Sequence, residues 1–264
     1  MKNRIEQKFK DLKRQRKKAF IAFLTSGDPN LETTRKLILA LEKAGVDIVE
    51  LGVPFSDPMA DGPTIQAASQ RALKKGVNLK NILKLVFQIR KSSQMPLALM
   101  TYYNPVLHYG EEKLIKDAAR FGVDGLIIPD LPPEEAKTII RAAKKNHIAT
   151  IFFIAPTSTP ERTKLVCGVS TGFIYYVSLT GVTGIRKKLP SDILKNIRSI
   201  KRKCAKPVCV GFGISTPLQV KAVARIGDGV IVGSAIVKAV ENNLSSRNLV
   251  KNVSNFVKRL TAAI

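Results

Sequence analysis

Short apolar segments rich in β-branched residues alternate along the chain with longer segments that have helical periodicity. Eight of the apolar runs are predicted to be strands: residues 19–25, 47–53, 96–102, 125–129, 149–154, 173–177, 207–211 and 229–233. Between them, apolar residues recur every three to four positions, most clearly in residues 31–44, 111–121, 134–145, 190–203 and 216–225. This alternation predicts βα units and therefore parallel strands.

The predicted strands are apolar on both faces, which is typical of parallel strands that are covered on both sides. Eight such strands joined by helices, with no linker between them, favour a closed (β/α)₈ TIM barrel. The alternative is an open, doubly wound sheet, which usually carries a glycine fingerprint after its first strand. Here that strand ends in the sequence TSGDP, residues 25–29. We therefore predict a single TIM-barrel domain over residues 1–264, with an extra helix before the first strand.

Composition bears on where the protein is located and on whether it binds a metal. The hydrophobic fraction is 45%, and no segment approaches the ~18 uninterrupted apolar residues that a membrane span needs. No apolar signal segment is evident near the N-terminus, so we expect a cytoplasmic protein that does not bind membranes. The three cysteines do not form a Cys-x-x-Cys pair, and the two histidines are far apart in sequence. No metal site is therefore predicted.

The charge of the chain is strongly basic, with a formal net charge of +24. Such a charge is also found in proteins that bind nucleic acids. The densest basic run, residues 13–18, has no interleaved aromatic residues, and most other lysines lie at solvent-facing spacing. We interpret the charge as a solvated basic surface and expect no specific nucleic-acid binding, although polyanions should adhere at low salt. A polyanion-binding protein without enzymatic activity is the alternative.

Active sites of TIM barrels lie at the carboxyl ends of the strands. No lysine falls within the eight runs, so a Schiff-base mechanism has no evident nucleophile. Glu50 stands out because it is a charged residue in the middle of an otherwise apolar segment, where an ionised side chain is costly. A functional role is favoured over a carboxylate that is merely satisfied by nearby donors.

Asp61 follows in a turn-rich loop and, taken alone, is interpreted as a turn or helix-capping residue. The remaining polar candidates at strand ends are Thr25, Tyr102, Asn104, Asp130, Tyr175 and Ser178.

Glycine-rich turns follow the last three predicted strands, at residues 181–184, 211–215 and 233–235. Glycine lets the backbone approach an anion, and the N-terminus of a helix offers free N–H groups. The loops after strands seven and eight are the usual phosphate site of TIM barrels. Each motif is weak alone, but together they predict a substrate that carries a phosphate group.

With these residues identified, the chain resembles the α subunit of tryptophan synthase over nearly its whole length. The segment ELGVPFSDPMADGPTIQ, residues 50–66, is close to the most diagnostic stretch of that family, and the glycine motifs agree in order and position. The resemblance implies retro-aldol cleavage of indole-3-glycerol phosphate to indole and glyceraldehyde-3-phosphate. A different phosphate-binding barrel, such as an isomerase or synthase of a neighbouring step, is the rival interpretation.

The resemblance also implies roles for individual residues. Glu50 is expected to shuttle protons, Asp61 to stabilise the charge on the indole N–H, and Tyr175 to line the site and assist. The apolar indole pocket is expected to contain Phe23, Tyr102, Thr183 and Phe212. The phosphate group is expected to bind backbone around Gly184, Gly213, Gly233 and Ser234.

A partner is implied by the same resemblance. The family assembles as α₂β₂ with a β subunit that receives indole directly, and pyridoxal phosphate is expected only in that subunit, with no cofactor in this chain. The proline-rich loop of residues 54–63 should lie at the barrel rim and face the partner. We expect an exposed Phe55, beside Asp57, to form part of the docking surface.

Overall fold

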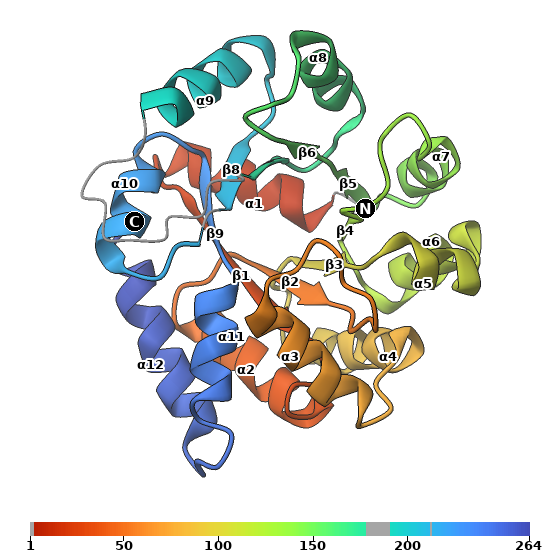
Figure 1. Cartoon of the computed structure of the whole chain (residues 1–264), viewed down its shortest axis with the longest axis vertical. Helices are drawn as coiled ribbons and strands as arrows, with labels where there is room; N and C mark the ends of the chain where they lie inside the picture. Colours follow the sequence, from red (N-terminus) through yellow and green to blue (C-terminus); the bar gives the residue numbers. More distant parts are fainter. Residues whose placement is uncertain (1–2, 178–190, 212) are drawn as a thin grey trace.

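The apolar runs predicted from the sequence form the strands of one parallel sheet. The computed structural model describes residues 3–177, 191–211 and 213–264. Within these residues the strands are β1 (Ala19–Thr25), β2 (Ile48–Gly52), β3 (Leu97–Met100), β4 (Gly125–Ile127), β5 (Ala149–Ile151), β6 (Phe153–Ile154), β7 (Ile174–Val177), β8 (Val208–Gly211) and β9 (Gly229–Val232). Figure 1 shows them surrounded by helices. The predicted (β/α)₈ barrel is confirmed.

The barrel closes through the fifth predicted strand, which the structure divides into two short pieces. The sheet order is β5-β4-β3-β2-β1-β9-β8-β7-β6, and only Phe152 separates β5 from β6 in the chain. β5 pairs with β4, whereas β6 pairs with β7. The run at 149–154 was predicted as one strand. The run is interrupted because its first half pairs with β4 and its second half pairs with β7.

Helices surround the sheet in the order expected for βα units, and Figure 1 shows this ring. In the described part of the chain they are α1 (Arg4–Arg14), α2 (Leu31–Lys43), α3 (Pro63–Leu73), α4 (Leu79–Arg90), α5 (Tyr103–Tyr109), α6 (Glu111–Phe121), α7 (Lys137–Lys145), α8 (Pro160–Val169), α9 (Ser191–Lys203), α10 (Pro217–Ala224), α11 (Ser234–Glu241) and α12 (Leu249–Thr261). The helix predicted from residue 134 begins only at Lys137, since Glu134 and Glu135 lie in a turn. None of the helices described is long and apolar enough to span a membrane.

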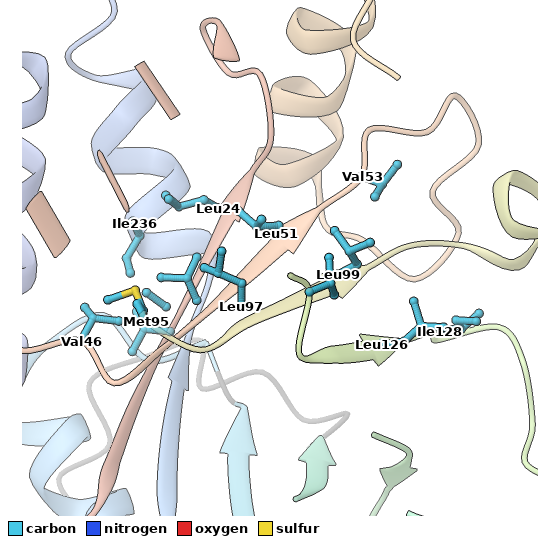
Figure 2. Close-up of a cluster of buried hydrophobic side chains, with 14 of the residues drawn as sticks. Leu24, Val46, Leu51, Val53, Met95, Leu97, Leu99, Leu126, Ile128 and Ile236 are labelled. Atoms are coloured by element: carbon cyan, nitrogen blue, oxygen red, sulfur yellow. The ribbon is translucent and has the colours of Figure 1, made fainter. Parts of the chain in front are cut away.

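Successive residues of each strand face opposite sides of the sheet, and this divides the core in two. Outward residues such as Leu24, Leu51 and Leu99 pack against the helices, and Figure 2 shows this layer. The alternate residues, among them Ile21 and Ile48, form a second cluster inside the barrel. Because the period of a strand is two, the residue two positions after Ile48 also points inward. That residue is Glu50.

The extra helix α1 covers the end of the barrel where the strands begin. Its buried residues Ile5, Phe9 and Leu12 belong to the same cluster as the inward strand residues. The ring of Phe9 lies 5.7 Å from that of Phe173, measured between centroids. Gly125 makes room for the helix, because a Cβ there would lie 2.8 Å from Ile5 Cδ1. The barrel interior is thus closed at this end.

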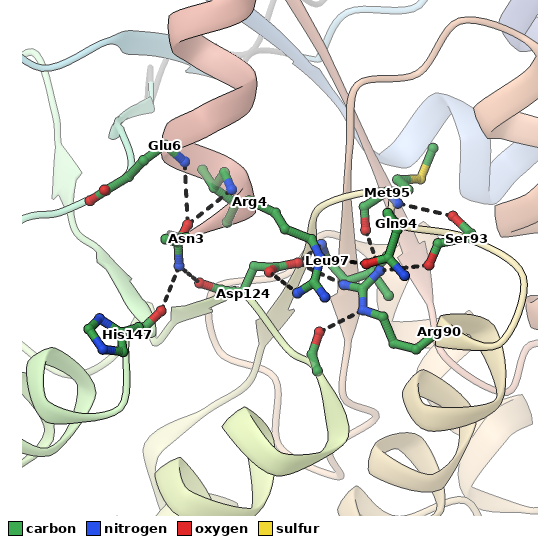
Figure 3. Close-up of polar contacts among 12 residues, drawn as sticks. Asn3, Arg4, Glu6, Arg90, Ser93, Gln94, Met95, Leu97, Asp124 and His147 are labelled. Carbon is green, nitrogen blue, oxygen red and sulfur yellow. Dashed lines mark hydrogen bonds and ion pairs between the residues drawn. The ribbon is translucent and has the colours of Figure 1, made fainter. Parts of the chain in front are cut away.

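Asp124, which precedes β4, gathers polar contacts at the closed end, as Figure 3 shows. Its carboxylate binds Arg90 Nη2 at 2.7 Å and Arg4 Nη1 at 2.9 Å, and it accepts a hydrogen bond from Leu97 N–H at 2.9 Å. The carboxylate is only 3% exposed. Asn3, which caps α1, donates to the backbone oxygen of Asp124 at 2.6 Å. This cluster ties α1 and α4 to the beginnings of two strands.

We predict that Asp124→Ala lowers the free energy of unfolding by about 3–5 kcal/mol, because it leaves the largely buried Arg90 without its counter-charge. Urea denaturation followed by circular dichroism measures the loss. Glu32→Ala, which breaks the exposed ion pair with Arg35, is the control and should leave the unfolding midpoint nearly unchanged. Equal effects of the two substitutions would contradict the assignment of Asp124 as the central contact.

Candidate active site

Glu50 lies inside the barrel on β2, between Phe23 of β1 and Ala98 of β3 in the strand register. Its side chain is completely buried, and neither carboxylate oxygen has a hydrogen-bond partner among the described residues. Burial disfavours the ionised form and raises the pKa of Glu50 to about 8. The alternative of a carboxylate satisfied by nearby donors therefore finds no support in the described part of the chain. A carboxyl group with a pKa near neutrality is suited to exchange protons.

Tyr175 faces the same interior from β7. Burial raises the pKa of its hydroxyl well above the ordinary value, and the negative charge of Glu50 raises it further. Its ring packs against Phe153 at 4.7 Å between centroids. Gly211 of β8 is required beside it, since a Cβ there would lie 2.6 Å from the Tyr175 ring. Tyr175 thus stays a neutral hydroxyl, and the structure brings it and Glu50 into the same interior.

Asp61 lies in the loop after β2 and lines a small pocket at the open end of the barrel. The pocket residues are Phe23, Thr25, Gly52, Val53, Asp61, Ile65, Ser69, Met100, Thr101, Tyr102 and Pro129. Burial raises the pKa of Asp61, and the nearby Tyr102 hydroxyl opposes this rise. Glu50 adjoins the pocket through two of its walls, because Phe23 is its register partner and Gly52 follows it on β2.

The predicted pocket residues fall into two groups. Phe23 and Tyr102 both line the pocket, as expected. The ring of Phe23 crosses to β2 over Gly52, where a Cβ would lie only 2.4 Å from it. The other two predicted pocket residues, Thr183 and Phe212, lie outside the described residues. So does Gly184, which was predicted to bind phosphate.

The described residues predicted to bind phosphate lie at the carboxyl ends of β8 and β9. Gly233 is the N-cap of α11, and no side chain caps the first N–H groups of the helix that begins at Ser234. Gly213 is exposed and has a φ of 43°, a conformation that favours glycine. An uncapped helix N-terminus is suited to hold an anion.

The sequence did not indicate two of the pocket residues, and one of its candidate site residues makes a different contact. Ile65 and Ser69 of α3 line the pocket, although α3 follows an irregular loop and gave no signal of its own. Asp130, a candidate at the end of β4, instead accepts hydrogen bonds from Tyr103 N–H at 2.9 and 3.1 Å, at the start of α5. Within the described ranges, no group of three or more His, Cys, Asp or Glu side chains is arranged to hold a metal ion.

Known proteins similar to this chain agree on one family. The family model described as tryptophan synthase alpha chain matches residues 9–264. The tryptophan synthase alpha chain of Geotalea daltonii is 48% identical, over 99% of this chain and 98% of its own length. That of Caldanaerobacter subterraneus subsp. tengcongensis is also 48% identical, over 98% of each chain. Tryptophan synthase subunit alpha from Legionella pneumophila str. Paris superposes with a TM-score of 0.93 at 36% identity, covering 100% of this chain and 99% of that one.

The parallel barrel and its buried carboxyl group, together with the family match, indicate a (β/α)₈-barrel enzyme of the lyase class. The match over nearly the full length distinguishes it from the other phosphate-binding barrels considered above. The chain belongs to the tryptophan synthase alpha chain family.

The raised pKa of Glu50 predicts how stability changes with pH. An acid whose pKa rises from 4.5 to about 8 on folding keeps its proton in the native state while the unfolded chain has lost it. The contribution of Glu50 to stability therefore falls between these pH values, by roughly 1.4 kcal/mol per pH unit. Glu50→Gln removes this loss, so the variant should gain stability over the wild type as pH rises.

Urea unfolding of the two proteins at several pH values across this window measures the difference. The difference should be small near pH 4.5 and largest near pH 8. A difference that does not change with pH would show that Glu50 is ionised in the native state throughout.

Proposed function

We propose that this chain cleaves indole-3-glycerol phosphate to indole and glyceraldehyde-3-phosphate, with Glu50 and Asp61 as its catalytic carboxyl groups. The observation that carries the proposal is the fully buried Glu50, which has no hydrogen-bond partner among the described residues and lies beside a pocket that Asp61 lines. Retro-aldol cleavage needs an electron sink, and an indole ring protonated on carbon supplies one. This chemistry requires groups that move protons rather than a nucleophile.

Glu50 is suited to the proton transfers because the pKa of about 8 keeps both of its states accessible near neutral pH. It would protonate the indole ring and accept the proton of the glycerol hydroxyl as the carbon–carbon bond breaks. Tyr175 supports this role, since its neutral hydroxyl lies in the same buried interior and can donate a hydrogen bond.

Asp61 is assigned to the indole nitrogen. Protonation of the ring at carbon leaves positive charge at the N–H, and a carboxylate in a partly buried pocket stabilises that charge more strongly than it would in water. The pocket supports the assignment, because Phe23 and Tyr102 supply aromatic walls beside Asp61. Thr183 and Phe212 are proposed to complete the indole pocket.

The phosphate group is assigned to the backbone at the ends of β8 and β9. The uncapped N-terminus of α11, at Gly233 and Ser234, supports this assignment, and Gly213 adds a glycine turn from the neighbouring strand. The free N–H groups and the helix dipole both favour an anion. Gly184 is proposed to contribute from the loop after β7.

A β subunit is proposed as the partner that receives indole, in an α₂β₂ assembly that lies in the cytoplasm and carries pyridoxal phosphate only in that subunit. The loop between β2 and α3 supports a docking role, because Met59 is 83% exposed and Asp57 is exposed beside it. Phe55 does not have the exposure expected of it: its ring packs against Tyr102 at 5.4 Å between centroids. Met59 therefore replaces Phe55 as the exposed apolar residue of this loop.

Glu50→Gln should lower the rate of indole release by at least about 100-fold, because an amide cannot exchange the proton that the reaction needs. Steady-state assays with indole-3-glycerol phosphate measure the rate. Glu42→Gln, at an exposed position of α2, is the control and should behave as wild type. Retention of more than about a tenth of the wild-type rate, a barrier change below ~1.4 kcal/mol, would remove Glu50 from the acid–base role.

Asp57→Ala should blunt the stimulation of cleavage by a tryptophan synthase β subunit and spare the basal rate of the isolated chain, since Asp57 lies on the exposed part of the loop. Mixing experiments give the two rates, and size-exclusion chromatography reports complex formation. Glu6→Ala, at an exposed position of α1 on the closed end of the barrel, is the control. Unchanged stimulation would separate the loop from the partner while leaving the cleavage activity intact.

A further inference from the structure

Tyr102, at the end of β3, contacts the loop of residues 54–61 at more than one point. The side chain is 5% exposed. Its hydroxyl oxygen accepts a hydrogen bond from Ala60 N–H at 3.0 Å. Its ring packs against Phe55, with an angle of 30° between the ring planes. One side chain from the segment between β3 and α5 thus contacts the loop that follows β2 near both of its ends.

The Tyr102 hydroxyl also has a proton to donate, and Asp61 is the nearby acceptor. A phenol has one proton to donate, and the bond from Ala60 uses only its oxygen as an acceptor. The proton is therefore free to be donated to the Asp61 carboxylate, which lies close enough for the Tyr102 hydroxyl to lower its pKa. Burial and the nearby Asp61 charge raise the pKa of Tyr102, so the phenol keeps its proton at neutral pH.

Few other bonds hold the loop. Met59 N–H and Asp61 N–H donate to Asp57 O and Pro58 O within the loop itself. Gln66 Nε2, from the helix that follows directly, donates to Asp61 O at 2.9 Å. Among the described residues, the bond to Tyr102 is the one hydrogen bond that joins residues 54–61 to a different strand end. Apart from α3, which follows Asp61 directly, Tyr102 is therefore the contact that fixes this part of the loop relative to the barrel.

We propose that Tyr102 is a positioning residue, whose hydroxyl fixes the backbone at Ala60 and orients the Asp61 carboxylate into the pocket. This role is distinct from that of its ring, which forms a pocket wall and would be kept by phenylalanine. The inference rests on the proposed assignment of Asp61 to the indole nitrogen. Loss of the hydroxyl leaves the wall in place and releases the carboxylate, so turnover should suffer more than binding.

The test is Tyr102→Phe, with Tyr103→Phe as the matched control. Tyr103 is the next residue, and its hydroxyl bonds to Glu111 Oε1 at 3.1 Å, away from the loop. The first measurement is amide hydrogen exchange of the full chain without ligand. In Tyr102→Phe the Ala60 amide loses its acceptor and should exchange about tenfold faster, whereas Tyr103→Phe should match the wild type.

The second measurement is the cleavage of indole-3-glycerol phosphate. Tyr102→Phe should lower kcat about tenfold with KM nearly unchanged, as expected when one hydrogen bond to a carboxylate is lost. Unchanged exchange at Ala60, or wild-type kcat despite faster exchange, would overturn the proposal. A wild-type chain that released no indole would refute the proposed function instead, and the exchange measurement would still decide whether the hydroxyl holds the loop.

Discussion

A closed parallel barrel has room inside for only every second side chain of each strand, and this constraint organises the whole molecule. Ile21, Ile48 and Phe173 meet in the interior, and α1 seals the end where the strands begin. The next inward positions along the same strands include Phe23, Glu50 and Tyr175, which therefore lie toward the open end. The polar interior residues Glu50 and Tyr175 are therefore placed by the strands that carry them.

Two buried carboxyl groups, those of Asp124 and Glu50, differ in whether neighbouring groups compensate their burial. Asp124 is nearly as buried as Glu50, but it has two arginine partners and a backbone N–H, which compensate its desolvation. Glu50 has no such partner in the described part of the chain, and its pKa rises accordingly. An uncompensated carboxyl group is a cost to stability, and it is also the property that makes a proton-transfer group effective near neutral pH.

The space around Glu50 depends on glycine and on aromatic rings. Gly52 and Gly211 allow the rings of Phe23 and Tyr175 to approach the neighbouring strands, where any Cβ would collide with them. Tyr102 then joins this rigid frame to the irregular loop that carries Asp61. The barrel places one carboxyl group through its backbone, whereas the other depends on a side-chain contact between two strand ends. The two carboxyl groups that we propose as catalytic are therefore positioned in different ways.

The sequence by itself determined the eight strand runs, their parallel arrangement and the unusual position of Glu50, because periodicity and local apolarity are properties of short segments. It also predicted Phe23 and Tyr102 as pocket residues, through resemblance to the family. Tertiary structure alone decided the division of the fifth strand, the packing of Phe55 on Tyr102 and the entry of Ile65 and Ser69 into the pocket. Each of these depends on contacts between segments far apart in the chain, and no local pattern specifies which distant side chain will fill a given space.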